Sequence, residues 1–142
     1  MSLFLRPWAA VFLGLLLLSN CSRTKPVDFG AGEHSCDVCR MNIVDMRFKA
    51  EAVSTKGKIY RFDSIECLAD WSQKHPGAWA LQWVTDFYHS QNWIPLEKAF
   101  ILKSERLPSP MGGNFSAYAT REDLNRALAE FGGVPLSWES LK

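Results

Sequence analysis

The chain has 142 residues, of which 47% are hydrophobic and 22% are charged, and its formal net charge is +1. This composition is typical of an ordinary globular domain. A nearly neutral chain argues against nucleic acid or another polyanion as a partner, because such partners need a strongly basic face.

The N-terminus has the pattern of an export signal. A single cationic side chain, Arg6, precedes an almost wholly apolar run over residues 8–18. This run is shorter than the ~20 apolar residues of a membrane-spanning helix and is typical of a secretory signal peptide. The sequence Leu-Ser-Asn-Cys that follows at 18–21 resembles the bacterial lipobox, although Asn20 stands where a smaller residue is usual.

We therefore predict that residues 1–20 are a lipoprotein signal peptide and that Cys21 is lipidated; an ordinary secretory signal or an uncleaved anchor is the alternative. More than one acyl chain gives stable anchoring, because each buried methylene contributes ~0.8 kcal/mol. Residues 21–35 are predicted to be the lipidated N-terminus and a linker, since residues 24–33 (TKPVDFGAGE) are rich in proline and glycine. Residues 36–142 then form one domain.

The first half of this domain reads as a hairpin followed by a helix and strands. Residues 49–54 and 58–62 alternate polar and apolar side chains and predict a β-hairpin. Asp63 and Glu66 predict a box-like cap for a helix that ends at the His-Pro-Gly of residues 75–77. The next segments are predicted to be a strand, a turn and a buried strand, at residues 78–87, 93–97 and 98–103.

The second half ends in the clearest helix of the chain. Residues 114–119 are predicted to be extended, and Thr120 caps a helix that stops at Gly132. Apolar residues repeat along one face of this helix at Leu124, Ala127, Leu128 and Phe131. Pairs of strands followed by helices predict a small α+β domain, with an antiparallel sheet shared by two ββα-like units.

The stretch CDVCRMN (residues 36–42) places Cys36, Cys39 and Met41 close together in sequence. With Cys21 lipidated, an odd number of thiols remains, which indicates an unpaired thiol or thiols kept for a metal. The C-x-x-C spacing serves disulfide exchange, zinc and copper alike. A structural zinc site needs a second pair of ligands, and the sequence has no second C-x-x-C and no paired histidines. A thioredoxin-like redox site needs a strand before the pair and a helix after it, and neither is predicted here. The thioether of Met41 favours Cu(I), because soft donors match a soft cation.

Met111 and Cys67 are two further sulfur-containing residues of the domain. Met111 lies in PSPMGGN, where prolines stiffen one side of a loop and glycines free the other, so its side chain can reach an ion or a partner strand. Filling a core is the alternative for the methionines. Cys67 falls inside the first helix among apolar neighbours and is predicted to be buried and inert. The histidines and Asp63 are open candidates for a third donor.

Four stretches together resemble the nitrous oxide reductase accessory lipoproteins, the NosL family. They are the end of the apolar run at Cys21 and the stretches CDVCRMNI, SPMGGN and LNRALAEFGG, at residues 36–43, 109–114 and 124–133. The resemblance implies a Cu(I)-binding metallochaperone of denitrifying bacteria that is lipid-anchored on the periplasmic side of a membrane, and we expect this membrane to be the outer one. Its implied partners are apo nitrous oxide reductase, whose copper-sulfide centre needs copper, and the associated membrane transporter complex.

The same resemblance implies that Cys39 and Met111 are the main copper ligands, with Met41 and Cys36 in second rank. Arg40 departs from the family, which usually has glycine there. We predict no enzymatic activity, because no carboxylate pair, activated nucleophile or phosphate loop is present. The alternative functions are a thiol-disulfide oxidoreductase that keeps a cuproprotein partner reduced, and a scaffold that docks a transporter.

Overall fold

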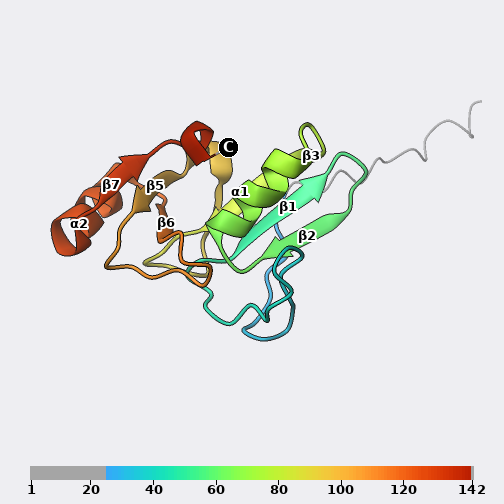
Figure 1. The fold of residues 1–142 in the computed structure, drawn as a ribbon, viewed down its shortest axis with the longest axis horizontal. Coiled ribbons are helices and arrows are strands. Elements are labelled where there is room, and N and C mark those ends of the chain that lie inside the picture. Colours follow the sequence, from blue (N-terminus) through green and yellow to red (C-terminus); the bar gives the residue numbers. More distant parts are fainter. Residues whose placement is uncertain (1–24, 142) are drawn as a thin grey trace, which may run out of the picture.

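The computed structural model describes residues 25–141 (Figure 1). The predicted signal peptide and Cys21 lie outside this range. Within it, no helix is long and apolar enough to cross a membrane.

The first sheet is antiparallel throughout and has the strand order β2-β1-β3-β4. Strands β1 (Ala50–Ser54) and β2 (Ile59–Phe62) form the predicted hairpin. Strand β3 (Trp79–Thr85) lies beside β1, as its aromatic and aliphatic sequence suggests. Strand β4 (Trp93–Pro95) corrects the prediction of a turn at residues 93–97, because Ile94 pairs with Val84 of β3 before the chain turns away.

Helix α1 (Ile65–Lys74) follows β2 and covers one face of this sheet (Figure 1). Its cap is Ser64, not Asp63 as predicted from the sequence. Ser64 is extended and fully buried, and its Oγ accepts a hydrogen bond from the backbone N–H of Cys67 at 3.3 Å. Glu66 does not close the predicted box, since its carboxylate accepts a hydrogen bond from Ser109. The carboxylate of Asp63 is therefore available for other contacts.

The second sheet has the order β6-β5-β7. It is formed by β5 (Phe100–Lys103), β6 (Phe115–Tyr118) and β7 (Val134–Leu136), and helix α2 (Arg121–Phe131) connects the last two. The predicted cap of α2 is confirmed, because Thr120 Oγ1 accepts from the N–H of Asp123 at 3.1 Å. Short 3-10 helices precede β5 and follow β7, namely η1 (Leu96–Lys98) and η2 (Trp138–Leu141).

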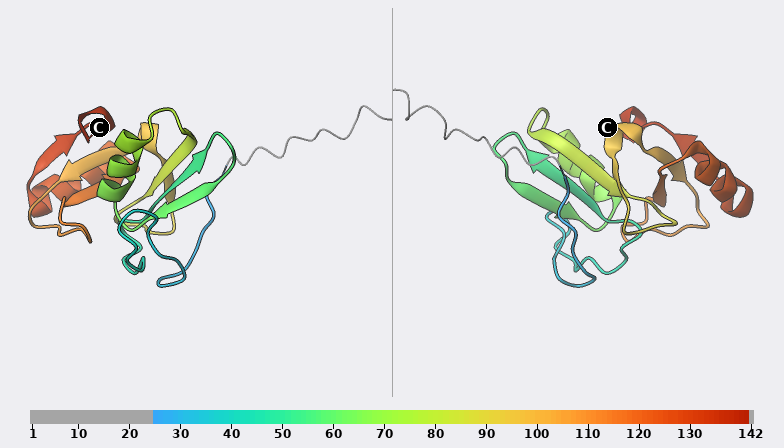
Figure 2. Two further views of the ribbon diagram at one scale, coloured as in Figure 1. Left: turned by 45° about the vertical axis from the view of Figure 1, so that its right-hand side comes forward. Right: turned by 180° about the vertical axis from the view of Figure 1, so that it is seen from behind.

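Strand β7 was not predicted, because Pro135 reads as a helix stop. Its place at the sheet edge explains why proline is accepted: an edge strand can leave one side without backbone donors. The α+β class and the two ββα-like units are confirmed, with one correction. Each unit has its own sheet instead of sharing one, and Figure 2 shows the two sheets and their helices side by side.

Strand β5 joins the two hydrophobic cores. Ile101 belongs to the core beneath α1, whereas its neighbour Leu102 belongs to the core beneath α2. Successive side chains of a strand point to opposite faces, so one short strand serves both cores. The two units therefore pack as one body.

Part of the predicted linker is packed against this body. The N–H of Val27 donates to Glu51 at 3.1 Å, and Lys49 pairs with Asp28 at 2.8 Å. Phe29 is only 8% exposed, and the ammonium of Lys49 lies 4.9 Å from its ring centre. An aromatic side chain and a buried cation thus hold residues 27–29 on the first sheet.

Candidate metal centre

The loop of residues 34–43 folds back on itself as a small hairpin that carries the C-x-x-C pair. The N–H of Cys36 donates to the carbonyl of Met41 at 2.8 Å, and the N–H of Arg40 donates to the carbonyl of Cys36 at 3.0 Å. Ser35 and Asn42 form a bridge just outside this turn. These bonds place both thiols on one tight turn.

Arg40 has a φ of 67°, in the left-handed region that glycine adopts most readily. The chain therefore turns at Arg40 with the backbone geometry expected of the glycine that is usual there. The arginine at this position therefore leaves the turn intact, and Arg40 is exposed to solvent.

Asp37 fixes this loop to the first sheet. Its N–H donates to the carbonyl of Arg61, and its carboxylate accepts from the N–H of Arg61, both at 2.8 Å. Asp63 lies two residues beyond Arg61, directly after β2 ends at Phe62, and only the cap residue Ser64 separates it from α1. The pairing of loop and strand therefore brings the thiols to the N-terminal end of α1.

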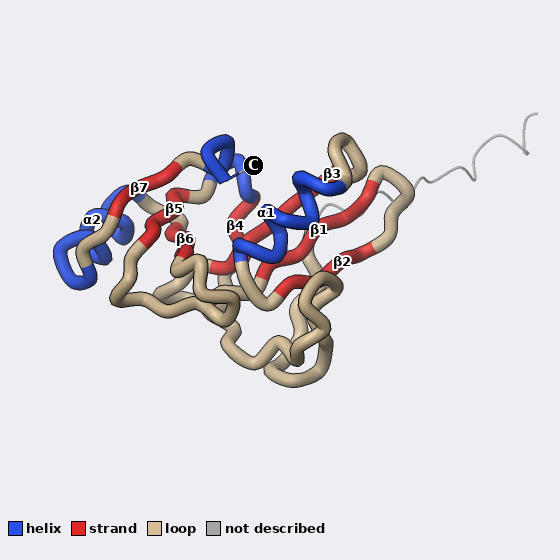
Figure 3. Tube along the Cα trace, viewed as in Figure 1, coloured by secondary structure: helices blue, strands red, loops and turns tan. Residues whose placement is uncertain are grey.

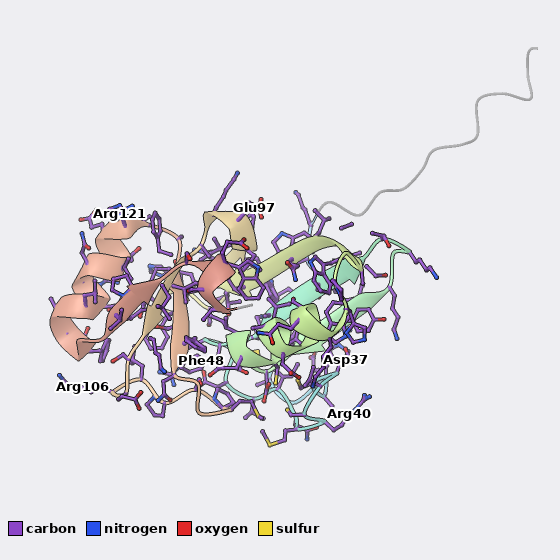
Figure 4. All side chains as sticks on the ribbon, turned by 45° about the horizontal axis from the view of Figure 1, so that its top comes forward. Asp37, Arg40, Phe48, Glu97, Arg106 and Arg121 are labelled. Atoms are coloured by element: carbon purple, nitrogen blue, oxygen red, sulfur yellow. The ribbon has the colours of Figure 1, made fainter. Side chains whose placement is uncertain are left out.

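Four side chains converge at this point. The sulfur atoms of Cys36, Cys39 and Cys67 and a carboxylate oxygen of Asp63 all lie within 4.8 Å of one another. Ligands that share one ion at about 2.3 Å lie up to about 4.6 Å apart, so only a small contraction is needed to hold a metal ion. The three cysteines of this cluster, Cys36, Cys39 and Cys67, are free thiols. Figure 4 shows sulfur atoms gathered beside the loop that carries the labelled Asp37 and Arg40.

The four groups differ in their access to solvent. Cys36 is 0% exposed and Cys67 is 3% exposed, whereas Cys39 is half-buried. The thiol of Cys39 donates to Asp63 Oδ2 at 3.3 Å, and Asp63 Oδ1 is buried without a hydrogen-bond partner in the described residues. Cys39 is therefore the most accessible of the three thiols, and Oδ1 of Asp63 is available to bind a metal ion.

The thiols also differ in acidity. A hydrogen bond from Cys67 is the main cause that lowers the pKa of Cys36 to about 6. The pKa of Cys67 is raised, first because it donates to Cys36 and then because it is buried. Burial raises the pKa of Cys39 to about 11, with contributions from Cys36 and Asp63. The first turn of a helix favours negative charge, so one thiolate is well accommodated here.

The Met111 loop is fixed to the same end of α1. Ser109 donates a hydrogen bond to Glu66, in the first turn of that helix, and accepts one from the N–H of Asn114 at 2.8 Å. Gly113 packs so closely on Glu66 that an added Cβ would clash with the side chain of Glu66. Figure 3 shows the long loops gathered along one side of the molecule. Met111 therefore lies in a loop that contacts Glu66, the residue directly before Cys67 in the sequence.

The methionines are not alike. Met41 is 46% exposed and Met111 is 44% exposed, so neither fills a core. Met46, by contrast, packs against the core beneath α1. Two exposed thioethers on loops at the end of α1 are able to offer soft donors to an ion that approaches from solvent.

Sequence reasoning missed one member of the cluster. Cys67 is buried in the core beneath α1, as predicted, and its sulfur also lies with the other two thiols. Asp63 was one of several open candidates for a third donor, and the cluster contains it and no histidine among the described residues. One feature of the sequence could have indicated this role. Cys67 lies three residues after the helix cap Ser64, and a side chain at that position can reach back to the segment before the helix.

These residues define an α+β domain of two ββα-like units with a thiol-rich cluster suited to a soft metal ion. The family model for NosL matches residues 26–142, and the chain belongs to the NosL family, as its motifs predict.

Among solved structures, the chain is similar to one described as the copper chaperone NosL from Shewanella denitrificans. The TM-score is 0.71 and the sequence identity is 17%, over 82% of this chain and 96% of that chain. At this identity the likeness establishes the fold. The comparison with curated proteins gives no match.

Proposed function

We propose that this protein is a Cu(I) metallochaperone that supplies copper for assembly of the copper-sulfide centre of nitrous oxide reductase. The observation that carries the proposal is the convergence of three thiols and one carboxylate within 4.8 Å. Membership of the NosL family and the likeness to a copper chaperone support it. The role is not enzymatic.

Copper is the ion that this protein would carry, and its proposed thiol ligands range from buried to half-buried, which suits transfer of the ion to a recipient protein. Cys36 and Cys67 would hold the ion from inside, and Cys39 would close the site at the surface. Thiols bind Cu(I) as thiolates, so loading releases protons, and Asp63 is placed to accept the one from Cys39. The exposed thioethers of Met41 and Met111 would exchange ligands with a recipient.

We also propose that Cys21 anchors the protein to the periplasmic side of a bacterial membrane, with the transporter complex and apo nitrous oxide reductase as partners. The packing of Val27 against Glu51 supports a short tether. Six residues span about 20 Å at most, so an anchored Cys21 would keep the domain close to the bilayer.

Titration of the reduced full chain with Cu(I), against a competing chelator and in detergent, tests the proposal. We expect tight one-to-one binding that collapses in Cys39→Ala and weakens in Met111→Ala. Met46→Ala is the matched control, because Met46 packs against the core. Equal affinity in all of these variants would refute the proposed copper site.

The thiol-disulfide oxidoreductase alternative is disfavoured by the thiols themselves. A redox nucleophile must be both accessible and acidic. Here the thiol with the lowered pKa, Cys36, is fully buried, and the accessible thiol, Cys39, has a raised pKa. A strongly oxidising potential for the Cys36–Cys39 pair, together with no copper binding, would favour this alternative.

A further inference from the structure

The cysteine cluster contains one donor that does not suit Cu(I). Three of its four members are thiols, and the fourth is the carboxylate of Asp63. Cu(I) is a soft ion and prefers sulfur ligands, whereas a carboxylate oxygen is a hard donor. Zn(II) lies between these extremes and accepts both thiolates and carboxylates. The mixed donor set therefore fits a divalent ion of the zinc class.

The fold supplies the second pair of zinc ligands that the sequence appeared to lack. The first pair, Cys36 and Cys39, lies on the hairpin loop. The second pair, Asp63 and Cys67, lies on either side of the helix cap Ser64. Three residues separate the members of this pair, a spacing that is usual for zinc ligands. Two pairs from separate segments can provide the four corners of a tetrahedron.

The distances within the cluster are close to those of a tetrahedral site. Around an ion with metal–sulfur bonds of about 2.3 Å and a metal–oxygen bond of about 2.0 Å, neighbouring ligand atoms lie ~3.5 to 3.8 Å apart. Cys39 Sγ and Asp63 Oδ2 are already 3.3 Å apart. All four ligand atoms lie within 4.8 Å of one another, so a contraction of about 1 Å at most closes the tetrahedron.

The cluster is also enclosed, as structural zinc sites are. Cys36, Cys67 and Asp63 are buried, and Cys39 is half-buried. Oδ1 of Asp63 makes no hydrogen bond within the described residues, although it is buried. A buried carboxylate oxygen without a partner is unfavourable, and a divalent cation would supply that partner. The N-terminal end of α1 further favours the negative charge of the ligands.

We propose that the cluster is a four-coordinate Zn(II) site, with the three thiolates and the carboxylate of Asp63 as its ligands. This inference goes beyond the proposed copper role and does not depend on it. Zn(II) and Cu(I) would share the thiolates, so one ion would exclude the other. The two ions would differ in their remaining donor, which is Asp63 for Zn(II) and Met111 for Cu(I).

A bound zinc ion would protect the thiols until copper arrives. Thiolates that are held by a metal ion cannot pair as disulfides while the ion remains in place. Soft thiolates favour Cu(I) over Zn(II), so Cu(I) would displace Zn(II) by ligand exchange. Neither ion would change its oxidation state in this exchange.

Zinc binding is measured by titrating Zn(II) alone into the reduced full chain in a non-ionic detergent, without oxygen and against a competing chelator. Co(II) is the spectroscopic probe, because tetrahedral thiolate-bound Co(II) absorbs visible light far more strongly than octahedral hydrated Co(II). We expect one ion per chain and a tetrahedral Co(II) spectrum that Zn(II) bleaches. Cu(I) should release the bound Zn(II).

Two substitutions distinguish the metals. Asp63→Ala should raise the Zn(II) dissociation constant by at least ~10-fold and leave that of Cu(I) unchanged, which also shows that the variant is folded. Met111→Ala should weaken Cu(I) binding and leave Zn(II) binding unchanged. Asp63→Cys offers a thiolate in place of the carboxylate and should restore zinc binding. Asp45→Ala, which removes a carboxylate paired with Arg47, is the control.

Three results would overturn the zinc site. They are an octahedral Co(II) spectrum, equal Zn(II) affinity in the wild type and Asp63→Ala, and simultaneous binding of Zn(II) and Cu(I) to one chain. Loss of both metals in Asp63→Ala that Asp63→Cys does not restore would also overturn it, because Asp63 would then serve packing and not coordination. Zinc binding without Cu(I) binding would support the zinc site and count against the proposed copper function.

Discussion

The thiol of Cys39 is hydrogen-bonded to the carboxylate of Asp63, 3.3 Å away, although the two residues are separated by 24 positions in the chain. Asp63 occupies this position because Ser64 caps α1 in its place. A carboxylate that accepts the thiol hydrogen stabilises the protonated form, so Asp63 restrains the reactivity of the Cys39 thiol.

Removal of this charge should make Cys39 more reactive. In Asp63→Asn, we expect the rate of alkylation at pH 8 to rise about three- to tenfold, because the pKa of Cys39 falls when the acceptor is neutral. Cys36 and Cys67 are buried, so mass spectrometry should find the label on Cys39. Asp45→Asn, which removes a carboxylate paired with Arg47 on the same segment, is the control. An unchanged rate would show that Asp63 does not restrain the thiol.

The apo protein should contain one thiolate at neutral pH. The pKa of Cys36 is lowered from 9.0 to about 6, so this thiol loses its proton above about pH 6 in the folded state and only near pH 9 after unfolding. Ultraviolet thiolate absorbance should therefore show a step near pH 6 in folded protein that is missing in urea. The step should move upward in Cys67→Ala, which removes the donor, and remain in Ser72→Ala. A single transition near pH 9 in the folded wild type would contradict this assignment.

Cys67 should contribute to copper affinity. Cys67→Ala keeps a good helix former in α1 but removes a sulfur from the cluster. We expect the Cu(I) dissociation constant to rise by at least the ~10- to 100-fold that loss of an outer-shell partner costs. Ser72→Ala, buried on the same helix, is the matched control for packing. An unchanged constant with a native circular dichroism spectrum would return Cys67 to the inert role that its sequence context suggests.

The turn at Arg40 should tolerate glycine better than a β-branched residue. Arg40→Gly should change the free energy of unfolding by less than about 1 kcal/mol. Glycine has no steric strain at a positive φ, but it loses more conformational entropy on folding, and the two effects offset each other. Arg40→Val should destabilise the protein by about 1–2 kcal/mol. Urea unfolding measures both, with Arg106→Val as the control at an exposed loop position without positive φ. Equal stability of the glycine and valine variants would show that the turn relaxes.

Local patterns were sufficient to predict most of the elements. The hairpin of β1 and β2 and the helix α2 follow from side-chain periodicity and from caps a few residues apart, which are properties of short segments. Strands β4 and β7 were missed because each is short and contains a proline, and only a neighbouring strand makes such a segment extended.

The sequence by itself determined the α+β class and the NosL family, and it predicted a soft-metal role for the C-x-x-C segment, because motifs and periodicity are encoded locally. Tertiary structure alone decided that Cys67 and Asp63 join Cys36 and Cys39 and that Ser64 caps α1 in place of Asp63. The physical reason is that these relationships depend on the pairing of Asp37 with Arg61, two residues that are 24 positions apart in the chain. Contacts between distant segments follow from packing, which no short stretch of sequence specifies.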